Sequence, residues 1–286
     1  MPRLRRVLAG LVVLPVLSLA GCGGGDGDQA VETVDLPAGL TAYVDQSRLL
    51  RTSRNAFLRL VDESDHTVTV TRAEIASPRF GTVTWTGEKS FPNETDLPFE
   101  VPPGRCGDGS DAQVRLTYRL DDGAERISEA TATDRYGALG LFLDRDCAQQ
   151  VLDEAATLEI GEPRVVGAGR ASVFELPVSL IPTGERDDVS FAGFEDTVLF
   201  RNTDRSIAAG SGRTFPLGAG DPPVELRLRL VPPRCDPHAL AEDKVGTLIG
   251  VRTAAPELSS VASFFLPIGD ERRAALRAFF ASHCGW

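Results

Sequence analysis

The chain has 286 residues, of which 42% are hydrophobic, and a formal net charge of -11 at pH 7. This length is sufficient for two domains of ordinary size. An acidic surface repels nucleic acid and anionic lipid, so the charge argues against a nucleic-acid-binding protein. No stretch of about 20 residues is both apolar and uncharged, which excludes a membrane-spanning helix of the usual length.

Residues 1–21 have the layout of a secretory signal peptide. Three arginines precede an apolar stretch over residues 7–19, and small residues then lead to Cys22. The run Leu19-Ala20-Gly21-Cys22 resembles the lipobox of bacterial lipoproteins. This resemblance implies cleavage before Cys22, a lipid such as palmitate on that cysteine, and an extracytoplasmic protein anchored to the cell membrane. The alternative is an ordinary secreted protein whose cleavage site adjoins a cysteine. Removing the three arginines of the leader would leave a formal charge of -14.

A glycine- and aspartate-rich stretch follows Cys22. Residues 23–28 read Gly-Gly-Gly-Asp-Gly-Asp. Glycine makes the backbone flexible and aspartate keeps it solvated. We therefore expect residues 22–37 to be a lipidated cysteine followed by a disordered tether.

The rest of the chain contains an internal repeat. Val101-Pro-Pro-Gly-Arg-Cys106 recurs as Val231-Pro-Pro-Arg-Cys235, and the apolar run 56–61 recurs at 173–178. Each half then ends in a second cysteine after an apolar run, at 139–143 and at 261–266. A period above about 100 residues indicates a duplicated domain rather than a solenoid. The predicted domains span residues 38–152 and 153–286.

Within each half the sequence predicts mainly strands. Residues 56–61, 67–75, 113–120 and 224–230 alternate apolar and polar side chains or are rich in β-branched residues. Several such strands in about 110–130 residues are typical of an antiparallel sandwich. The predicted fold is mainly β, with two tandem antiparallel immunoglobulin-like β-sandwich domains. A short C-terminal helix is expected over residues 271–283 with Asp270 as its cap, and a shorter helix or turn over residues 147–156.

Four cysteines remain once Cys22 is assigned to lipid. An even number in an exported protein predicts disulfides, and four cysteines allow three pairings. The repeat favours Cys106–Cys147 and Cys235–Cys284, one in each domain. Zinc binding is the competing interpretation, but no C-x-x-C spacing exists and no histidine lies close to Cys106 or Cys147 in the sequence.

The densest polar cluster is Arg234-Cys-Asp-Pro-His-Ala-Leu-Ala-Glu-Asp-Lys244. Asp236 before Pro237 predicts a helix start, with His238 and Glu242 four residues apart on one face. A functional interpretation makes Asp236, His238 and Glu242, with Asp243, a metal or ligand site. The alternative, which we favour, is a capped turn with solvated charges.

This segment resembles one in uncharacterised lipoproteins of high-GC Gram-positive bacteria. That resemblance implies an exported lipoprotein without an assigned activity and transfers no catalytic residue. The chain has three histidines and no G-x-S-x-G elbow, so we expect no enzyme and no cofactor. The predicted function is a membrane-anchored lipoprotein that binds an envelope protein or polymer and no nucleic acid. The alternatives are a small-ligand or metal-binding lipoprotein with its site near residues 234–244, and a hydrolase with an unrecognised site.

Overall fold

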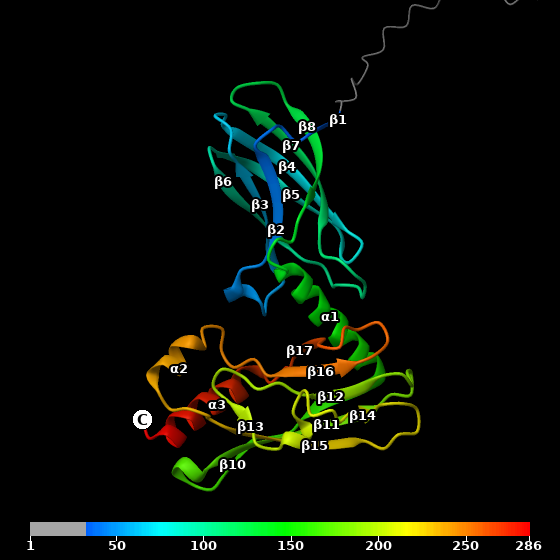
Figure 1. The fold of residues 1–286 in the computed structure, drawn as a ribbon, viewed down its shortest axis with the longest axis vertical. Coiled ribbons are helices and arrows are strands. Elements are labelled where there is room, and N and C mark those ends of the chain that lie inside the picture. Colours follow the sequence, from blue (N-terminus) through cyan, green and yellow to red (C-terminus); the bar gives the residue numbers. More distant parts are fainter. Residues whose placement is uncertain (1–32) are drawn as a thin grey trace, which may run out of the picture. The chain divides into compact units, whose positions relative to one another are not determined.

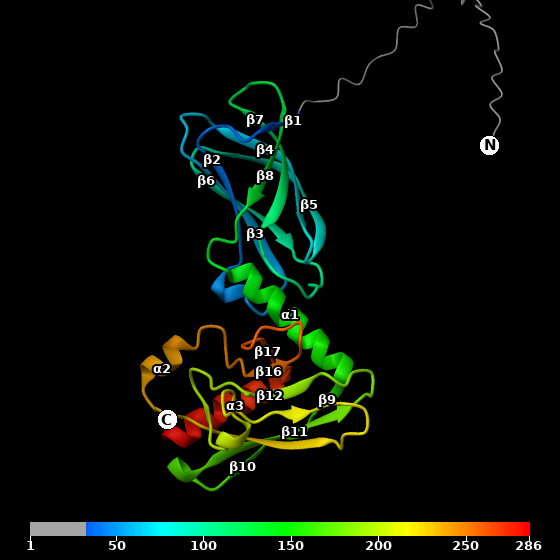
Figure 2. The same ribbon diagram turned by 45° about the vertical axis from the view of Figure 1, so that its right-hand side comes forward.

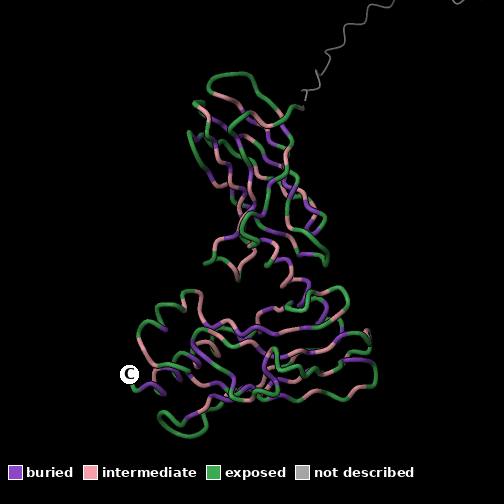
Figure 3. Tube along the Cα trace, in the orientation of Figure 1, coloured by how far each residue is buried: buried purple, intermediate pink, exposed green. Residues whose placement is uncertain are grey.

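Strands form where the sequence alternates apolar and polar residues. A computed structural model describes residues 33–286, and three of the expected strands appear as β3 (Asn55–Asp62), β4 (Val68–Ser77) and β7 (Ala112–Leu120). In β7 the apolar side chains Val114 and Leu116 are buried and Arg115 between them is exposed. Buried and exposed positions alternate along many of the strands (Figure 3).

The first half of the chain folds into two sheets around one hydrophobic core (Figure 1). One sheet has the order β2-β3-β6, with β2 at Leu40–Asp45 and β6 at Glu94–Glu100. The other has the order β1-β8-β7-β4-β5, with β1 at Thr33–Asp35, β5 at Gly81–Phe91 and β8 at Arg126–Ala132. The core between them includes Leu58, Leu97, Ile75 and Leu116, all fully buried.

The second half also folds into two sheets around its own core. One has the order β10-β11-β15-β13, and β9 also pairs with β11. The other has the order β14-β12-β16-β17. The bounds are β9 Ala156–Ile160, β10 Arg164–Val166, β11 Val173–Pro182, β12 Ser190–Phe194, β13 Arg201–Asn202, β14 Phe215–Pro216, β15 Val224–Val231, β16 Gly250–Ala254 and β17 Ser263–Phe265.

The two halves share one order of strand pairing. The sheet β2-β3-β6 corresponds to β9-β11-β15, and β8-β7-β4-β5 corresponds to β17-β16-β12-β14. Every pairing in these four series is antiparallel. In the first half β6, which runs into Val101-Pro-Pro, pairs with β3, which carries the apolar run 56–61. In the second half β15, which ends at Val231 before Pro-Pro, pairs with β11, which carries the run 173–178. The repeat read from the sequence therefore extends to sheet topology.

Three α-helices are present in the part of the chain that the structure describes: α1 (Ala138–Ala155), α2 (Pro237–Glu242) and α3 (Gly269–Cys284). Helix α1 is longer than the turn predicted over 147–156, because the apolar run 139–143 is helical. Helix α3 begins before the predicted start. Its N-cap position is Ile268, and Asp270 lies in the first turn, so the predicted Asp270 cap is wrong.

The sequences of α1 and α3 match when their cysteines are aligned. Each helix has a buried leucine eight residues before the cysteine and two buried apolar residues four and five residues before it. The residues are Leu139, Phe142, Leu143 and Cys147 in α1, and Leu276, Phe279, Phe280 and Cys284 in α3. The counterpart of the apolar run 139–143 therefore lies in α3. The sequence-based pairing of this run with residues 261–266 is wrong, because those residues contain the strand β17.

Both favoured disulfides are present. Cys106 pairs with Cys147 and Cys235 with Cys284, at Cα–Cα separations of 4.9 and 5.4 Å. Each joins the loop after a Val-Pro-Pro strand to a helix. The two disulfides thus join corresponding positions in the two halves of the chain.

Helix α1 contributes to both cores (Figure 2). Its first turns place Leu139 and Leu143 in the first core, and its later turns place Val151 and Leu152 in the second. It contacts β2 as well as β9, β16 and β17. The boundary predicted at 152/153 therefore falls within a helix shared by the two cores.

Most of the N-terminal predictions concern residues that the structure does not describe. The leader, Cys22 and the tether as far as residue 32 lie outside the described residues. Residues 33–35 form β1, which pairs in parallel with β8, so the tether prediction is wrong at this end. Between residues 33 and 286 no helix is long and apolar enough to cross a membrane.

Candidate functional site

The predicted polar cluster forms the short helix α2 and its flanks. Asp236 is the N-cap, and its carboxylate accepts a hydrogen bond of 3.0 Å from the Ala239 amide. Glu242 forms an ion pair with Arg234, and His238 is exposed. Within residues 33–286 no group of three or more His, Cys, Asp or Glu side chains is placed to hold a metal ion. Asp236, His238 and Glu242 are therefore not a metal-ligand set in this structure.

The end of the same segment lines a charged cavity of about 450 Å³, here called the arginine cavity. One wall is the loop Glu242–Gly246, and another is Glu195–Val198. The opposite wall carries three cations and an aromatic ring: Arg48, Arg51, Arg145 and Phe265. Its volume lies in the range of small-molecule sites.

Two elements position the arginines. The 3-10 helix η1 (Arg48–Leu50) lies between β2 and β3, and its cap Ser47 accepts a hydrogen bond from the Leu49 amide. The Arg51 Nε donates to the Arg48 carbonyl at 3.1 Å, which holds the end of this turn. Arg145 projects from the middle of α1, and its guanidinium lies 4.5 Å from the centre of the Phe265 ring.

The carboxylates that line the cavity are bound to other cations. Glu195 pairs with Arg252 at 2.9 Å and Asp196 with Arg205 at 3.0 Å. Glu242 pairs with Arg234. Asp243 forms no ion pair within residues 33–286, and burial raises the pKa of its carboxyl against the opposing effects of a hydrogen bond from Thr247 and the charge of Arg277. These acids form no ion pair with the arginine wall, although the negative charges of Glu195 and Asp144 act to raise the pKa of Arg145.

The arginine wall is left with net positive charge. Arg48, Arg51 and Arg145 form no ion pair with any carboxylate of the described chain. Burial, and then repulsion from Arg51, lowers the pKa of Arg145, although an arginine stays charged at physiological pH. An unpaired, partly buried cation with a perturbed pKa, such as Arg145, is typical of binding sites. The arrangement is suited to an anionic group.

Exposed apolar side chains surround the arginines. A second hollow of about 380 Å³ joins Arg48, Arg51 and Arg145 to the start of α1. Of the twelve large hydrophobic residues exposed in the described chain, five belong to η1 or line these two hollows: Leu49, Leu50, Tyr136, Leu141 and Val198. In Figure 3 the segment around η1 is drawn as intermediate or exposed. Contiguous exposed apolar patches are typical of interaction surfaces.

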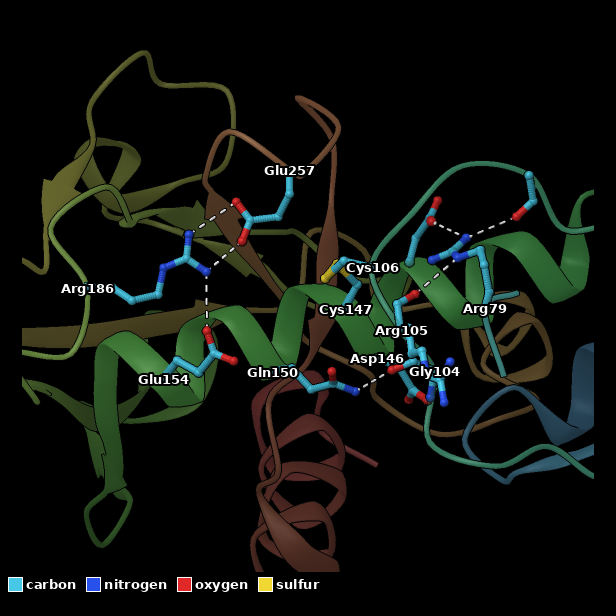
Figure 4. Close-up of a disulfide and its surroundings, with 12 residues drawn as sticks. Arg79, Gly104, Arg105, Cys106, Asp146, Cys147, Gln150, Glu154, Arg186 and Glu257 are labelled. Atoms are coloured by element: carbon cyan, nitrogen blue, oxygen red, sulfur yellow. Dashed lines mark hydrogen bonds and ion pairs between the residues drawn. A yellow bond between two sulfur atoms is a disulfide. The ribbon is translucent and has the colours of Figure 1, made fainter. Parts of the chain in front are cut away.

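A smaller cavity of about 210 Å³ lies beside the Cys106–Cys147 disulfide. Its most buried charge is Arg79, with 4% of the side chain exposed. Arg79 donates to the Arg105 carbonyl at 3.2 Å and to Asp144 at 2.9 Å (Figure 4). Because these bonds fix the loop that carries Cys106, we assign Arg79 a structural role.

Figure 4 also shows how α1 is held on both sides. Gly104 donates its amide to Asp146 at 2.8 Å and accepts a hydrogen bond from Gln150 at 2.6 Å. Further along the helix, Arg186 pairs with Glu154 at 3.2 Å and with Glu257 at 2.5 Å. These contacts fix α1, and therefore Arg145, against both cores.

One buried pair resembles catalytic machinery in its residue types. Ser172 Oγ lies 3.2 Å from His283 Nδ1. Both residues are buried, and no carboxylate of the described residues hydrogen-bonds to His283. The Ser172 hydroxyl donates instead to the Gly169 carbonyl. This pair ties α3 to the segment before β11, as Asp146 and Arg54 tie α1 to the segment before β3.

Sequence reasoning found one wall of the cavity and missed the other two, Glu195–Val198 and the arginine wall. Asp243 and Glu242 were in the predicted cluster, whereas Arg48, Arg51 and Arg145 were not singled out. Arginine is common in this chain, and the three lie on two segments about 100 residues apart. Only the fold of the chain places them around the same hollows, and no local pattern signals it.

No protein-family model matches the chain, and no curated protein matches it. Among solved structures it is similar to red sea bream transglutaminase, with 10% identity, a TM-score of 0.25, and coverage of 80% of this chain and 31% of that one. An exo-chitosanase of Amycolatopsis orientalis is 11% identical with a TM-score of 0.20, and the match covers 80% of this chain and 26% of the enzyme. The BSP domain of a biofilm-associated protein is 9% identical with a TM-score of 0.22, over 84% of this chain and 60% of that one. The chain thus spans less than two thirds of each, and similarity at this level supports no inference about function.

Proposed function

We propose that the chain is a lipid-anchored, extracytoplasmic and non-enzymatic lipoprotein that binds an envelope protein or polymer through anionic groups of that partner. The observation that carries the proposal is the arginine cavity, where three cations face hollows without carboxylate partners. Charge-assisted hydrogen bonds to a carboxylate or phosphate would relieve their mutual repulsion. The lipobox-like run before Cys22 and the two disulfides support export and anchoring.

We also infer that the body consists of two copies of an immunoglobulin-like sandwich, at 38–152 and 153–286, with α1 shared between them. The matched strand order and the equivalent disulfides support this interpretation. Seven antiparallel strands in two sheets are typical of that architecture. Such folds serve many functions, so the binding role rests on the cavity and not on the fold.

The binding proposal is tested with the full-length protein in detergent and fluorescent poly-L-glutamate as a generic carboxylate ligand. We expect salt-sensitive binding that weakens by about tenfold or more in the double variant Arg51→Gln/Arg145→Gln, since each charged hydrogen bond contributes about 1.5–3 kcal/mol. The control Arg227→Gln removes an exposed arginine of β15 and should leave the affinity unchanged. No binding, or equal affinities for all three proteins, would contradict the proposal.

A small anionic ligand is the second candidate, because the volume of about 450 Å³ would accommodate one. Citrate and inorganic phosphate serve as competitors in the same titration. A competitor that displaces the polymer at micromolar concentration favours a small-ligand site. Displacement only at concentrations that act as bulk salt favours a macromolecular partner.

The membrane anchor has a separate test. The Cys22→Ala variant should lose incorporation of a palmitate analogue and move from the membrane fraction to the soluble fraction. The two disulfides report whether the variant is folded. A folded variant that stays in the membrane fraction would contradict lipid anchoring at Cys22.

A further inference from the structure

The surface beside the arginine cavity is apolar as well as basic. In η1, Leu49 and Leu50 stand between Arg48 and Arg51, and 61% of Leu49 is exposed. At the start of α1, Leu141 is 51% exposed and lines the hollow that also contains Arg145. Exposed leucines alternate here with cations, whereas a purely electrostatic site for a soluble polyanion would need no leucines.

The second half of the chain shows the equivalent place closed. There the 3-10 helix η2 (Gly169–Ala171) lies between β9 and β11 and packs against α3. Next to η2, the contact of Ser172 with His283 has its counterpart in the first half in Arg54 and Asp146, so only the packing of the 3-10 helix differs. In the first half, η1 occupies the corresponding position between β2 and β3, but a hollow of about 380 Å³ separates its residues from the start of α1. This hollow, here called the groove, is lined by Tyr136, Leu141 and the three arginines, and Leu49 follows Arg48 in η1 beside it.

We infer that this groove, together with the exposed turn η1 beside it, docks an acidic amphipathic segment of another protein, with its apolar side chains on Leu141 of the groove and Leu49 of η1 and its carboxylates on Arg48, Arg51 and Arg145. This inference rests on the proposed binding function and adds the class of partner. Arginine, tyrosine and apolar side chains are enriched at interfaces, and clustered anchors supply most of the binding energy. The net charge of the body repels acidic partners elsewhere, so complementarity directs such a segment to this groove.

Two synthetic helical peptides of equal length and charge test the inference with the full-length protein. One carries glutamates on one face and leucines on the other, and its match has serine in place of leucine. We expect the leucine peptide to bind about tenfold more tightly than the serine peptide, since burying anchor leucines typically contributes more than 1 kcal/mol. Leu49→Ser in η1 and Leu141→Ser in the hollow should each remove most of this difference, whereas Val165→Ser, at an exposed valine of β10 that belongs neither to η1 nor to the hollows, should not.

The alternative outcomes separate this inference from the function on which it rests. If both peptides and poly-L-glutamate bind equally and the leucine variants have no effect, the inference is wrong and the anion-binding function stands. If phosphatidylglycerol vesicles bind through Leu49 and Leu141 but neither peptide does, the groove faces a membrane and the inference is wrong. If neither peptide nor poly-L-glutamate binds, the proposed function itself fails.

Discussion

Arg145 shows why the cavity is interpreted as a binding site and not as a structural ion-pair network. Its guanidinium is half-buried against Phe265 and close to Arg51, and it has no carboxylate partner in the described chain. By contrast, Arg54, Arg79 and Arg186 each pair with a carboxylate at 3.2 Å or less. An unpaired buried charge costs stability, and a bound anion would offset that cost.

Asp243 gives a prediction about pH. Burial raises the pKa of its carboxyl in the folded chain above the value in the unfolded chain. The folded state therefore binds this proton more tightly, and the resulting stability is lost as pH rises through the folded pKa. Asp243→Asn should raise the melting temperature at pH 7, and its effect should shrink below about pH 4, where both states are protonated.

Differential scanning calorimetry of the full-length protein at both pH values measures this change. The control Asp65→Asn alters an exposed aspartate and should shift neither melting temperature. A destabilised Asp243→Asn variant at pH 7 would mean that the hydrogen bond from Thr247 and the charge of Arg277 outweigh the cost of burying the carboxylate.

At the scale of elements, Asp146 is the main tie between α1 and the strands of the first half. Its carboxylate accepts hydrogen bonds from Arg54 at 2.6 Å and from the Gly104 amide at 2.8 Å. Asp146→Ala leaves both donors without this acceptor, so we expect a loss of about 2–3 kcal/mol in the free energy of unfolding. Urea denaturation measures it, and Gln149→Ala on the exposed side of α1 should cost far less. A loss below 0.5 kcal/mol (about the effect of an ordinary surface substitution) would contradict this role for Asp146.

The Cys235–Cys284 disulfide holds α3 against the loop that precedes α2. Its cysteines are 49 residues apart in sequence, and closing a loop of this size stabilises the fold by about 4 kcal/mol in the chain-entropy model. The double variant Cys235→Ala/Cys284→Ala should lose that much free energy of unfolding. An unchanged urea midpoint would mean that the disulfide does not form in solution.

Strands were more predictable than helices in this chain. Alternation along 113–120 and 224–230 indicates one buried face, and β7 and β15 cover these residues. Helix α1 was underestimated because Gly140 interrupts its apolar run and because α1 buries residues on more than one side. One face meets the first core near Leu143, and another meets the second near Leu152. A helix that enters two cores lacks the single apolar stripe on which sequence prediction depends.

At the scale of the whole molecule, the shared helix predicts cooperative unfolding. Trp85 packs against the first core, and the Trp286 ring lies 5.5 Å from Phe280 of the second. Each tryptophan reports on one half when the other is replaced by phenylalanine. We expect both fluorescence signals to change at the same urea concentration.

Leu152→Ala, which removes a buried side chain of α1, should lower both urea midpoints together, with a loss of about 2–5 kcal/mol in the free energy of unfolding. Two separate midpoints would mean that the halves unfold independently.

The duplication was open to prediction from the sequence, but the site was not. Both halves keep the Val-Pro-Pro strand and the helix cysteine, so the repeat can be read from a few landmarks. The arginine cavity exists only where the halves differ. Arg48 and Arg51 lie in a connection whose counterpart is closed by η2, and the loop after Cys235 is longer than the loop after Cys106. Residues that differ between the two copies cannot be identified by comparing the copies, so the repeat gave no indication of the arginine cavity.

The central claim is that the groove around Arg51 and Arg145 is the surface that meets the partner. The most direct measurement is site-specific photo-cross-linking in intact cells from a probe at position 49, compared with a probe at position 165. The account predicts a defined protein adduct from position 49 that disappears in the Arg51→Gln/Arg145→Gln background, and no such adduct from position 165. An adduct from position 49 that survives loss of both arginines, or the same adduct from position 165, would contradict it.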